Sequence, residues 1–528
     1  MNKANKPQQP AAKKLETINP RTEAVIAKVE LTDAKGVQAA VHAAHEAFVP
    51  WALTPASRRL EAIEGIRDHI LQNAAAIANV ISEEQGKPLA EAMSADILPA
   101  VGLANFVVRN YGRITTEESI PMEVLKGLKS SSLVWKPLGV IAVVTPWNFP
   151  FSIPLSSILF ALAAGNTVVF KPASEVPLIG TTIQRCIVEG GKLPEGVFNL
   201  VLAPGRDVGD TLFSPPVKKV VFTGSSETGK WIQKACAEHL IPTVLELGGK
   251  DPFIVLEDAD IELAAQGAVW GAFANCGQVC ASVERVYVVK EVYEQFLHRV
   301  LDHVSRLRLG TDGVDDYEVG PLVNAEQLEI VEQQVKDALH KGANVLAGGK
   351  RPAGKGYFYE PTVLTEVDHT MAVMTDETFG PLMPIMQVDD AAQAIELAND
   401  SPFGLTASVW TRDREWARRI ALQLDAGTVT VNDHGHTFAL AETPWHGAKE
   451  SGIGVTHGAG GLKEFMFPMH LHQDNAAMMK RRMWWYPYSS ESFSLFHEFA
   501  KAVTHKVKLP AFAATVLRKK QWRKAILG

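Results

Sequence analysis

The sequence predicts an α/β fold in which two lobes of similar size each hold a mostly parallel sheet. From residue 132 onward, short β-branched runs alternate with turns and helical segments, which is typical of βαβ units. Before them, Ala-rich residues 36–110 carry apolar side chains at helical spacing, which indicates a layer of helices. A length of 528 residues allows two to four domains and a large core.

The elements of the first lobe follow from four stretches. We expect a strand and a turn in "GVIAVVTPWNFP" and again in "AGNTVVFKPAS". A strand, a Gly turn and a helix follow in "KKVVFTGSSETGKWIQKACAE", and two short strands in "PTVLELGGKDPFIVL". The second lobe runs from about residue 250 to 445, where "ERVYVVKEVYEQFLHRVLDHVSRL" and "GPLMPIMQVDDAAQAIELAND" each predict a strand followed by a helix. A cleft between the lobes is the expected place for a ligand.

Composition and charge narrow the classes of function. The chain is 46% hydrophobic and 21% charged, which is typical of a soluble protein. A net charge of −7 gives no reason to expect a nucleic-acid partner. The polar N-terminus lacks the apolar core of a secretory signal, and no uninterrupted apolar run approaches the roughly 20 residues that span a bilayer. We therefore expect a cytoplasmic protein whose four cysteines are reduced.

Two turns after predicted strands have the chemistry of a nucleotide site. In "VVFTGSSETG", Gly224, Ser225 and Gly229 lie between a strand and a helix, where free amides attract phosphate. In "VVFKPASE", Lys171 ends a buried strand, where a cation could bind a ribose hydroxyl or a phosphate. On these residues alone, a structural turn and a surface lysine remain open as alternatives.

Two further segments supply groups that could assist a nucleophile. In "TPWNFPF", two prolines fix the backbone around Asn148, whose amide could donate to an oxyanion. In "LELGGKDP", Glu246 follows apolar residues, which would raise the pKa of its carboxyl towards that of a base active near neutral pH. A Pro-rich turn and a salt-bridged carboxylate are the structural alternatives.

The stretch "FANCGQVCAS" holds Cys276 and Cys280. Their CxxxC spacing is neither the common zinc spacing nor a CxxC redox pair, and no cysteine follows in the remaining 248 residues. A mixed metal site with His434, His436 or His446 is conceivable, but its ligand spacing is absent, so we expect no metal. A reactive thiolate supported by Asn148 and Glu246 is the remaining interpretation.

Together with "ETFGPL" and "PWHGAKESGIG", these segments resemble the aldehyde dehydrogenase superfamily in order and spacing over about 450 residues, from residue 18 to 468. The resemblance implies oxidation of an aldehyde to the carboxylic acid with NAD or NADP. It implies that Cys280 is the nucleophile, carrying a thiohemiacetal and then a thioester, that Asn148 and the backbone N–H of Cys280 hold the oxyanion, and that Glu246 activates the hydrolytic water. Cys276 falls on a variable position, with a reversible disulfide to Cys280 left as a hypothesis.

The resemblance also implies the cofactor site. Glu377 matches the residue that holds the nicotinamide ribose, with Phe379 beside it, and Trp147 lines the cofactor cleft. Lys171 matches the lysine of the adenosine ribose, and Gly224, Ser225 and Gly229 match the pyrophosphate segment. Ser174 stands where a ribose-binding Glu is common, and Glu175 comes one residue later. A missing carboxylate relieves repulsion of a 2′-phosphate, so the choice between NAD and NADP stays open.

The resemblance implies a Rossmann-like cofactor domain at residues 16–125 and 137–247 and an α/β catalytic domain at 248–448. A small β-flap, formed by residues 126–136 with 462–474, is expected to pair subunits into a homodimer or homotetramer. Two alternatives to hydrolytic oxidation stay open, a CoA-acylating relative and a non-catalytic scaffold on the same fold.

Residues 475–528 form a basic, aromatic tail outside the common core of that family. From Lys480 to the C-terminus the net charge is +9, against −16 for the rest of the chain. The tail brings Trp484, Trp485, Tyr486 and Tyr488 together. These aromatics either dock on the protein or contact an anionic membrane surface, so peripheral membrane association is one expectation for the tail.

Overall fold

The computed structural model describes residues 14–122, 129–312, 316–435, 437–475 and 484–504, with 518 and 520. Its contacts divide the chain into two compact units. The larger unit comprises Met1–Ile114 with Pro137–Met466, and the smaller unit comprises Thr115–Lys136 with Phe467–Gly528. Both predicted lobes lie within the larger unit, and the predicted flap and tail lie mainly in the smaller one.

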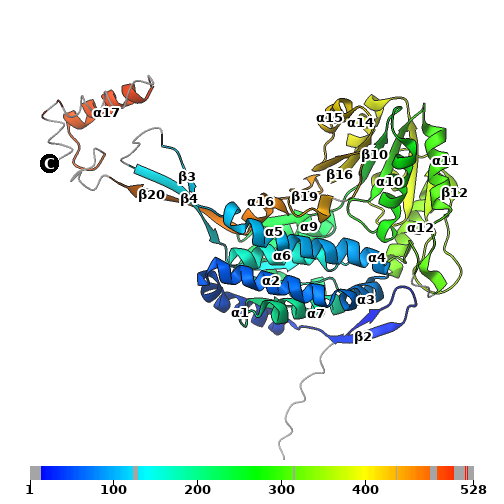
Figure 1. Cartoon of the computed structure of the whole chain (residues 1–528), viewed down its shortest axis with the longest axis horizontal. Helices are drawn as coiled ribbons and strands as arrows, with labels where there is room; N and C mark the ends of the chain where they lie inside the picture. The colour runs from blue at the N-terminus through cyan, green and yellow to red at the C-terminus, as the bar shows by residue number, and fades with distance from the viewer. Residues whose placement is uncertain are drawn as a thin grey trace, which may run out of the picture. The chain divides into compact units, whose positions relative to one another are not determined.

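The helical layer predicted at residues 36–110 is confirmed (Figure 1). A short antiparallel hairpin, β1 and β2, precedes it. Asp33 caps the first helix by accepting a hydrogen bond from the amide of Gly36. The elements are β1 (Lys14–Ile18), β2 (Val25–Glu30), α1 (Ala34–Leu53), α2 (Ala56–Gln72), α3 (Ala74–Gln85), α4 (Leu89–Glu91), the π-helical η1 (Ala92–Ile97) and α5 (Leu98–Ile114).

The first lobe is a six-stranded sheet with the order β19-β9-β8-β5-β6-β7. Five of its strands are parallel, and β19 joins antiparallel to β9. The chain runs outward from β5 through β6 and β7, then returns to β8 and β9, so the strand order reverses between β5 and β8. In such sheets the ligand binds at this switch point, beyond the carboxyl ends of the strands. The strands are β5 (Val140–Val144), β6 (Thr167–Lys171), β7 (Phe198–Leu200), β8 (Val217–Thr223), β9 (Thr243–Glu246) and β19 (Gly452–Ile453).

Helices cover both faces of this sheet. On one face, α1 and α9 share an apolar core with alternate side chains of the strands. Helix α6 is buried over its entire length, which explains why its sequence is apolar all round rather than amphipathic. The remaining elements of this lobe are α6 (Ser152–Ala164), α7 (Pro177–Arg185), η2 (Cys186–Gly190), α8 (Gly205–Val208), η3 (Gly209–Phe213), α9 (Ser226–Ala237) and α16 (Gly458–Lys463).

The second lobe is a seven-stranded sheet with the order β12-β13-β14-β11-β10-β16-β17. All neighbours pair in parallel except β12, which pairs antiparallel with β13. The central strands are buried on both faces, as parallel strands between helices should be. The strands are β10 (Asp251–Val255), β11 (Val283–Val289), β12 (Asn344–Ala347), β13 (Thr362–Thr365), β14 (Leu382–Val388), β16 (Thr406–Trp410) and β17 (Thr428–Val431).

Helices α10 and α11 lie together on one side of this sheet, and α14 and α15 lie on the other (Figure 1). This placement follows from right-handed crossovers, because the chain leaves β10 in one direction along the sheet and later returns past it in the other. The elements are α10 (Ile261–Phe273), η4 (Ala274–Gly277), α11 (Tyr293–Val304), η5 (Gly310–Asp312), α12 (Ala325–His340), α13 (Ala372–Thr375), α14 (Ala391–Asn399), β15 (Phe403–Gly404), α15 (Arg414–Ala421), η6 (Thr437–Ala439) and β18 (Ala448–Lys449).

In its described residues, the smaller unit contains a three-stranded sheet with the order β20-β4-β3 and the helix α17. As predicted, "SSSLVWKPL" and "KEFMFPMHLH" lie on adjacent strands, held in part by an ion pair between Lys129 and Asp474. The boundaries differ from the predicted flap, since the sheet begins at β3 and Leu462 lies in α16 instead. The elements are β3 (Glu118–Ser119), β4 (Lys129–Pro137), β20 (Met466–Asp474) and α17 (Ser490–Thr504).

In the described part of the chain, one continuous helical run is long and apolar enough to cross a bilayer, Leu89–Ile114. More than half of its apolar window is buried in the protein. Asp96 lies within this run and forms a buried ion pair with Lys87. Core helices pass the same test of length and composition, and the burial accounts for the apolar sequence here.

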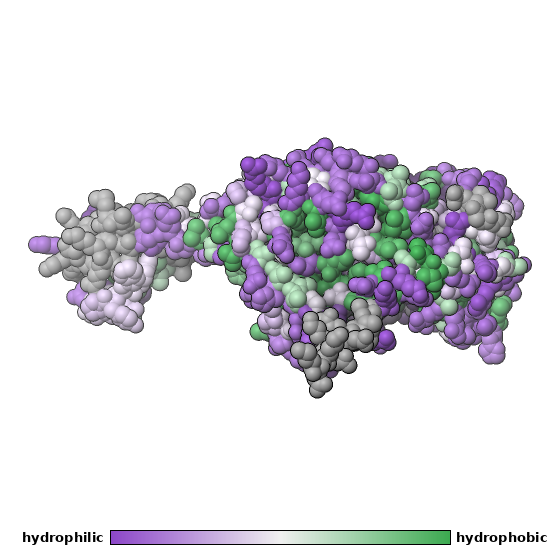
Figure 2. Space-filling model, turned by 90° about the horizontal axis from the view of Figure 1, so that it is seen from below, coloured by the Kyte–Doolittle hydropathy of each residue, from purple (hydrophilic) through white to green (hydrophobic). Residues whose placement is uncertain are grey.

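The surface of the larger unit is mixed in polarity. Figure 2 shows apolar residues exposed between hydrophilic ones in the middle of the face that is seen from below. Exposed apolar side chains on the unit include Leu53, Leu71, Leu98 and Leu240. Single exposed apolar residues are common on protein surfaces, whereas a group of them around a cavity marks a binding site.

Candidate active site

Cys280 lies in the loop between η4 and β11, and an unusual backbone turn precedes it. Asn275, Cys276 and Gly277 have φ values of 49°, 57° and 72°, so three consecutive residues are left-handed. A β-carbon at Gly277 would lie 2.2 Å from the carbonyl oxygen of Gly380. Left-handed backbone is strained for residues other than glycine, and such strain persists only where surrounding contacts hold it.

Buried hydrogen bonds from distant segments hold this turn. The side-chain amide of Asn275 donates to the carbonyls of Asn148 and Gln278, at 3.0 and 3.1 Å. Its side-chain oxygen accepts from Gln85, at 2.7 Å. Its backbone N–H donates to the carboxylate of Glu91, at 3.0 Å. The turn before Cys280 is therefore fixed by α3 and α4 and by the loop that carries Asn148.

A fully buried lysine connects the same elements. Lys87 forms an ion pair of 2.8 Å with Asp96 and donates to the carbonyl of Asn148, also at 2.8 Å. The other carboxylate oxygen of Asp96 accepts from the amides of Phe151 and Ser152, where α6 begins. Since both charges are removed from water, they are stable only with these partners in place.

Asn148 is buried and is held by hydrogen bonds to its backbone carbonyl and from its side-chain amide. Its side-chain amide donates to the carbonyl of Gln278, at 3.1 Å, which links it to the loop of Cys280. An amide NH₂ carries two donors, so one remains for a ligand. The side-chain oxygen of Asn148 has no hydrogen-bond partner among the described residues. This arrangement suits a preorganised donor to an oxyanion.

Glu246 and Cys280 line one small cavity, together with Thr223, Leu405 and Trp445. Glu246 ends β9 and is 5% exposed. Burial raises the pKa of its carboxyl well above the ordinary value of 4.5, and the nearby Trp445 offsets this only in part. Among the described residues, neither carboxylate oxygen accepts a hydrogen bond of good geometry. An unsatisfied buried carboxylate next to a thiol is the environment of a general base.

The thiol of Cys280 faces a negative environment. Burial raises its pKa first, and the carboxylates of Asp251, Glu377 and Glu246 raise it further. A positive charge or a proton acceptor must therefore come close before a thiolate forms. Cys276 differs, because its side chain packs in the apolar core of the second lobe and burial keeps it a thiol.

Cys280 also lines a second, larger cavity of about 530 Å³. Asn275 from the strained turn lies in its wall, and apolar side chains dominate the rest. The cavity approaches Cys280 from the side of α5 and α10, whereas Glu246 shares the smaller cavity on the side of β9. A substrate and a base would thus reach the sulfur from different cavities.

The residues predicted for the cofactor lie at the carboxyl ends of the first sheet. Lys171 ends β6, is buried, and donates to the carbonyl of Pro172, at 3.1 Å, while burial lowers its pKa. Ser174 and Glu175 follow in a half-buried turn, and the charge of Glu175 partly restores the pKa of Lys171. Ser225 caps α9 by accepting from the amide of Thr228.

The glycines beside Ser225 allow close packing. A β-carbon at Gly229 would lie 2.5 Å from the side chain of Leu247, so the first turn of α9 packs directly on the residue after Glu246. The amide of Gly224 donates to the carbonyl of Glu246, at 3.0 Å. The predicted phosphate turn at Gly224 and the predicted base Glu246 therefore lie at the ends of two paired strands, β8 and β9.

Glu377 reaches across from the second lobe and accepts a hydrogen bond from the amide of Gly249, at 3.0 Å. Burial raises the pKa of its carboxyl to about 8. Phe379 has a φ of 50° and meets the ring of Trp147 edge to face, with centroids 5.4 Å apart. The carboxylate of Glu377 therefore lies close to Cys280, and the paired rings of Trp147 and Phe379 lie in the same region.

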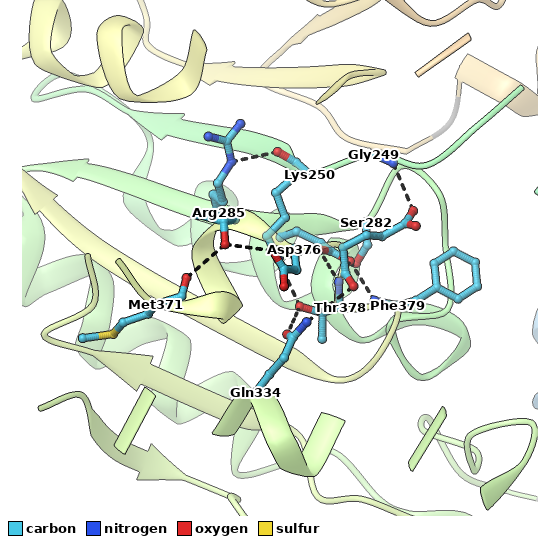
Figure 3. Close-up of polar contacts among 12 residues, drawn as sticks. Gly249, Lys250, Ser282, Arg285, Gln334, Met371, Asp376, Thr378 and Phe379 are labelled. Carbon is cyan, nitrogen blue, oxygen red and sulfur yellow. Dashed lines mark hydrogen bonds and ion pairs between the residues drawn. The ribbon is translucent and has the colours of Figure 1, made fainter. Parts of the chain in front are cut away.

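A buried polar network orients this segment (Figure 3). Glu284 accepts from the amides of Thr378 and Phe379 and pairs with Lys250 at 2.7 Å. Thr378 also donates to Gln334, at 2.7 Å. The left-handed backbone at Phe379 is thus held by hydrogen bonds to a single buried carboxylate.

This donor set fits a pyridine dinucleotide. The cation of Lys171 ends β6 and the amino end of α9 follows β8, so the two lie on either side of the switch point, where such cofactors bind. The carboxylate of Glu377 suits a ribose diol, and the pair of Trp147 and Phe379 offers apolar surface to a flat ring.

The structure also places the histidines considered for a metal. His434 is buried, and its ring nitrogen lies 2.8 Å from the hydroxyl of Ser408. His436 lies outside the described residues, and His446 is half-buried in the loop before β18. Among the described residues, no three His, Cys, Asp or Glu side chains are grouped so as to hold a metal ion.

Several residues of the site were not found from the sequence. Lys87, Glu91 and Asp96 lie in the predicted helical layer, and Glu284 and Lys250 lie at strand ends of the second lobe. In the sequence, each is one charged residue among many. A weak signal was available in Asp96, a charge within an otherwise apolar helical run, because such a residue is stable only with a buried partner.

Known proteins share this arrangement over nearly the whole chain. The aldehyde dehydrogenase family model matches residues 7–470. A lactaldehyde dehydrogenase from Escherichia coli is 38% identical over 459 residues, which cover 86% of this chain and 93% of the relative. A probable succinate-semialdehyde dehydrogenase [NADP(+)] from Sinorhizobium fredii is 37% identical over 472 residues, covering 88% and 94%.

Solved structures agree with this result. A betaine aldehyde dehydrogenase from Staphylococcus aureus, crystallised in complex with NAD+, superimposes with a TM-score of 0.84 at 33% identity and covers 90% of this chain and 94% of its own. The chain is an α/β oxidoreductase of the same architecture, and it belongs to the aldehyde dehydrogenase family.

Proposed function

We propose that this enzyme oxidises an aldehyde to the carboxylic acid through covalent catalysis on Cys280. The observation that carries the proposal is the position of Cys280 in the walls of two cavities, one shared with Glu246 and one open to a substrate. The cofactor is NAD or NADP, in keeping with relatives that use NADP(+) or bind NAD+. Lys171, Ser225 and Glu377 would hold it.

In the first step, the thiol of Cys280 releases its proton to solvent water, and its sulfur bonds to the aldehyde carbon. The carbonyl π bond breaks, and the resulting oxyanion is stabilised by the side-chain amide of Asn148. Gln278 and Lys87 position Asn148 for this contact. NAD(P)+, when bound, supplies the acceptor for the hydride that leaves the thiohemiacetal carbon, and a thioester on Cys280 remains.

In the second step, Glu246 takes a proton from water, and the water oxygen attacks the thioester carbon. The carbon–sulfur bond breaks, the carboxylic acid leaves, and the electron pair returns to the sulfur of Cys280. Burial raises the pKa of Glu246, so its ionised carboxylate is a stronger base than that of an exposed glutamate. This water-activating carboxylate favours hydrolysis over transfer to CoA.

The assignment is tested by Cys280→Ala. The variant is expected to bind NADH or NADPH like the wild type, measured by quenching of protein fluorescence, and to form no NAD(P)H with any aldehyde. Cys276→Ala is the matched control, because Cys276 lies four residues upstream in η4 and packs in the core. Turnover by Cys280→Ala would contradict the proposal.

Product analysis separates the alternatives. Free acid formed without CoA supports hydrolysis, whereas a strict need for CoA with an acyl-CoA product would assign the enzyme to the CoA-acylating class. A scaffold protein would show no turnover at all. Running NAD and NADP in parallel on one aldehyde settles which dinucleotide is preferred.

The smaller unit supports a proposal about assembly. Strand β20 is nine residues long, mostly exposed, and has one neighbour, β4, in the described sheet. Phe467 and Leu471 are exposed along it. A long edge strand with exposed apolar side chains is a template for pairing with another chain. We therefore propose a homodimer, or a homotetramer built from two dimers, joined through β20.

The tail supports a proposal about location. Trp485, Tyr486, Tyr488 and Phe493 are more than half exposed. The tail carries a net charge of +9. Exposed aromatics beside basic residues favour contact with an anionic lipid surface. We propose a cytoplasmic enzyme that associates peripherally with a membrane through residues 475–528.

A further inference from the structure

The larger cavity beside Cys280 has a consistent chemical character. Its volume is about 530 Å³, within the range of small-molecule sites. Aromatic and aliphatic side chains make up most of its wall, among them Phe149, Ile153, Trp270, Val279, Phe438 and Trp445. The polar side chains among the described lining residues are those of Glu91, Ser94, Asn275 and His434.

Three of these four polar side chains make hydrogen bonds within the protein. Asn275 is held by Gln85 and by the carbonyls of Asn148 and Gln278. The carboxylate of Glu91 accepts from the amide of Asn275, and burial raises its pKa to about 7. His434 contacts Ser408. The polar part of the wall therefore shapes the Cys280 loop and leaves apolar surface to meet a ligand.

The cavity offers no cation to an anionic substrate. None of its described lining residues is Lys or Arg. The buried Lys87 nearby is paired with Asp96, donates to the carbonyl of Asn148, and lies 4.2 Å from the ring centre of Phe149. A carboxylate brought into this cavity would lose its hydration, gain no partner and face Glu91.

The apolar wall continues to the surface. Leu98 on α5, Trp270 on α10 and Leu440 after η6 line the cavity and are 64%, 48% and 46% exposed. An apolar rim lets a substrate extend outward from Cys280 without crossing a polar boundary. Each methylene that contacts this wall would add to binding.

Resting on the proposed function, we infer that the substrate is a neutral, apolar aldehyde, with a chain that fills the cavity between Cys280 and the rim of Leu98, Trp270 and Leu440. Small anionic aldehydes are poor substrates. The apolar cavity beside Cys280 therefore distinguishes this enzyme from family members that act on anionic aldehydes.

The test uses aldehydes matched in shape and different in charge. Succinate semialdehyde is compared with 4-methylpentanal, in which an isopropyl group replaces the carboxylate. The neutral aldehyde is expected to have a kcat/KM at least about 100-fold higher, since a buried charge without a partner costs several kcal/mol. From butanal upward, kcat/KM is expected to rise by about fourfold per methylene until the cavity is filled.

A variant tests the cavity directly. Leu440→Arg places a cation at the rim and is expected to raise the ratio of kcat/KM for succinate semialdehyde over 4-methylpentanal by at least about tenfold. Leu240→Arg is the matched control, because Leu240 is 91% exposed and is not part of the cavity wall. The control should leave the ratio unchanged.

The outcomes separate the two proposals. If no aldehyde is oxidised, the proposed function itself fails. If aldehydes are oxidised but succinate semialdehyde equals or exceeds 4-methylpentanal, the substrate class is wrong and the proposed function stands. If Leu240→Arg shifts the ratio as much as Leu440→Arg, the preference arises from overall charge and the assignment to this cavity is overturned.

Discussion

At the scale of single residues, Glu246 shows how burial sets chemistry. The carboxyl is nearly inaccessible, its oxygens lack hydrogen bonds among the described residues, and its pKa is raised. The ionised form is therefore a stronger base than a surface glutamate. The same burial means that the base is lost to protonation at a higher pH than usual.

We expect Glu246→Gln to slow hydrolysis of the thioester more than its formation. Stopped-flow measurement should show about one NAD(P)H per active site formed rapidly, followed by turnover slowed by about 100-fold or more. In the wild type, kcat should rise with pH through a pKa well above 4.5, and this limb should be absent in Glu246→Gln. Loss of the rapid phase in Glu246→Gln would assign Glu246 to the first step instead, and an unchanged pH profile would show that another group titrates.

The family resemblance, and not residue chemistry alone, selected Cys280 over Cys276, and the structure places the two side chains in different surroundings. Cys276 packs in the core of the second lobe, and Cys280 lines both cavities. A disulfide between them would require the side chain of Cys276 to leave that core. The structure therefore gives the redox hypothesis no support.

At the scale of elements, buried charges join helices that the sequence shows as separate. Lys87 precedes α4, and Asp96 lies in η1. The backbone amides that donate hydrogen bonds to Asp96 lie where α6 begins. Through the carbonyl of Asn148, the same lysine reaches the predicted oxyanion donor. The helical layer is thus part of the support of the active site.

Lys87→Met is expected to lower the free energy of unfolding by about 3–5 kcal/mol, because Asp96 would keep a buried charge without its partner. It should also lower kcat, since Asn148 loses a contact that positions it. Urea denaturation and steady-state kinetics measure the two effects.

Lys230→Met provides the control for that prediction. Lys230 pairs with Glu450, but both side chains are about half exposed, so the expected change is about 0–1 kcal/mol. Equal destabilisation by the two variants would show that burial of the Lys87 pair has no special cost.

At the scale of the whole molecule, the two units support different proposals. The larger unit contains both sheets and every described residue assigned to catalysis. The smaller unit contains the exposed edge of β20 and the aromatic tail. Assembly and membrane contact are therefore separable by truncation.

We expect a protein truncated after Asp474 to keep β20, and with it the oligomeric state of the full chain, measured by light scattering. It should keep its activity on soluble aldehydes but lose binding to vesicles containing phosphatidylserine, measured by pelleting at low and high salt. A protein that dissociates on truncation would assign assembly to the tail. Absence of vesicle binding by the full chain at low salt would exclude the membrane proposal.

The sequence by itself determined the fold class and most elements near the site. Alternation of β-branched runs with helical segments predicted β5, β6, β8, β9, β10, β11 and β14, because strand and helix periodicity are local properties. The motifs around Cys280, Glu246 and Asn148 identified the family. The three-residue strand β7 was missed, since so short a run carries little periodic signal.

The tertiary structure decided what surrounds those residues. In the fold, Lys87 pairs with Asp96 and Glu284 pairs with Lys250. The apolar run Leu89–Ile114 forms a continuous helix whose apolar part is more than half buried. The fold also gathers Leu98, Trp270 and Leu440 into one rim. These contacts join residues that are remote in the chain, and their strength depends on shared burial. No local pattern in the sequence encodes such burial, so the character of the aldehyde cavity follows from the fold.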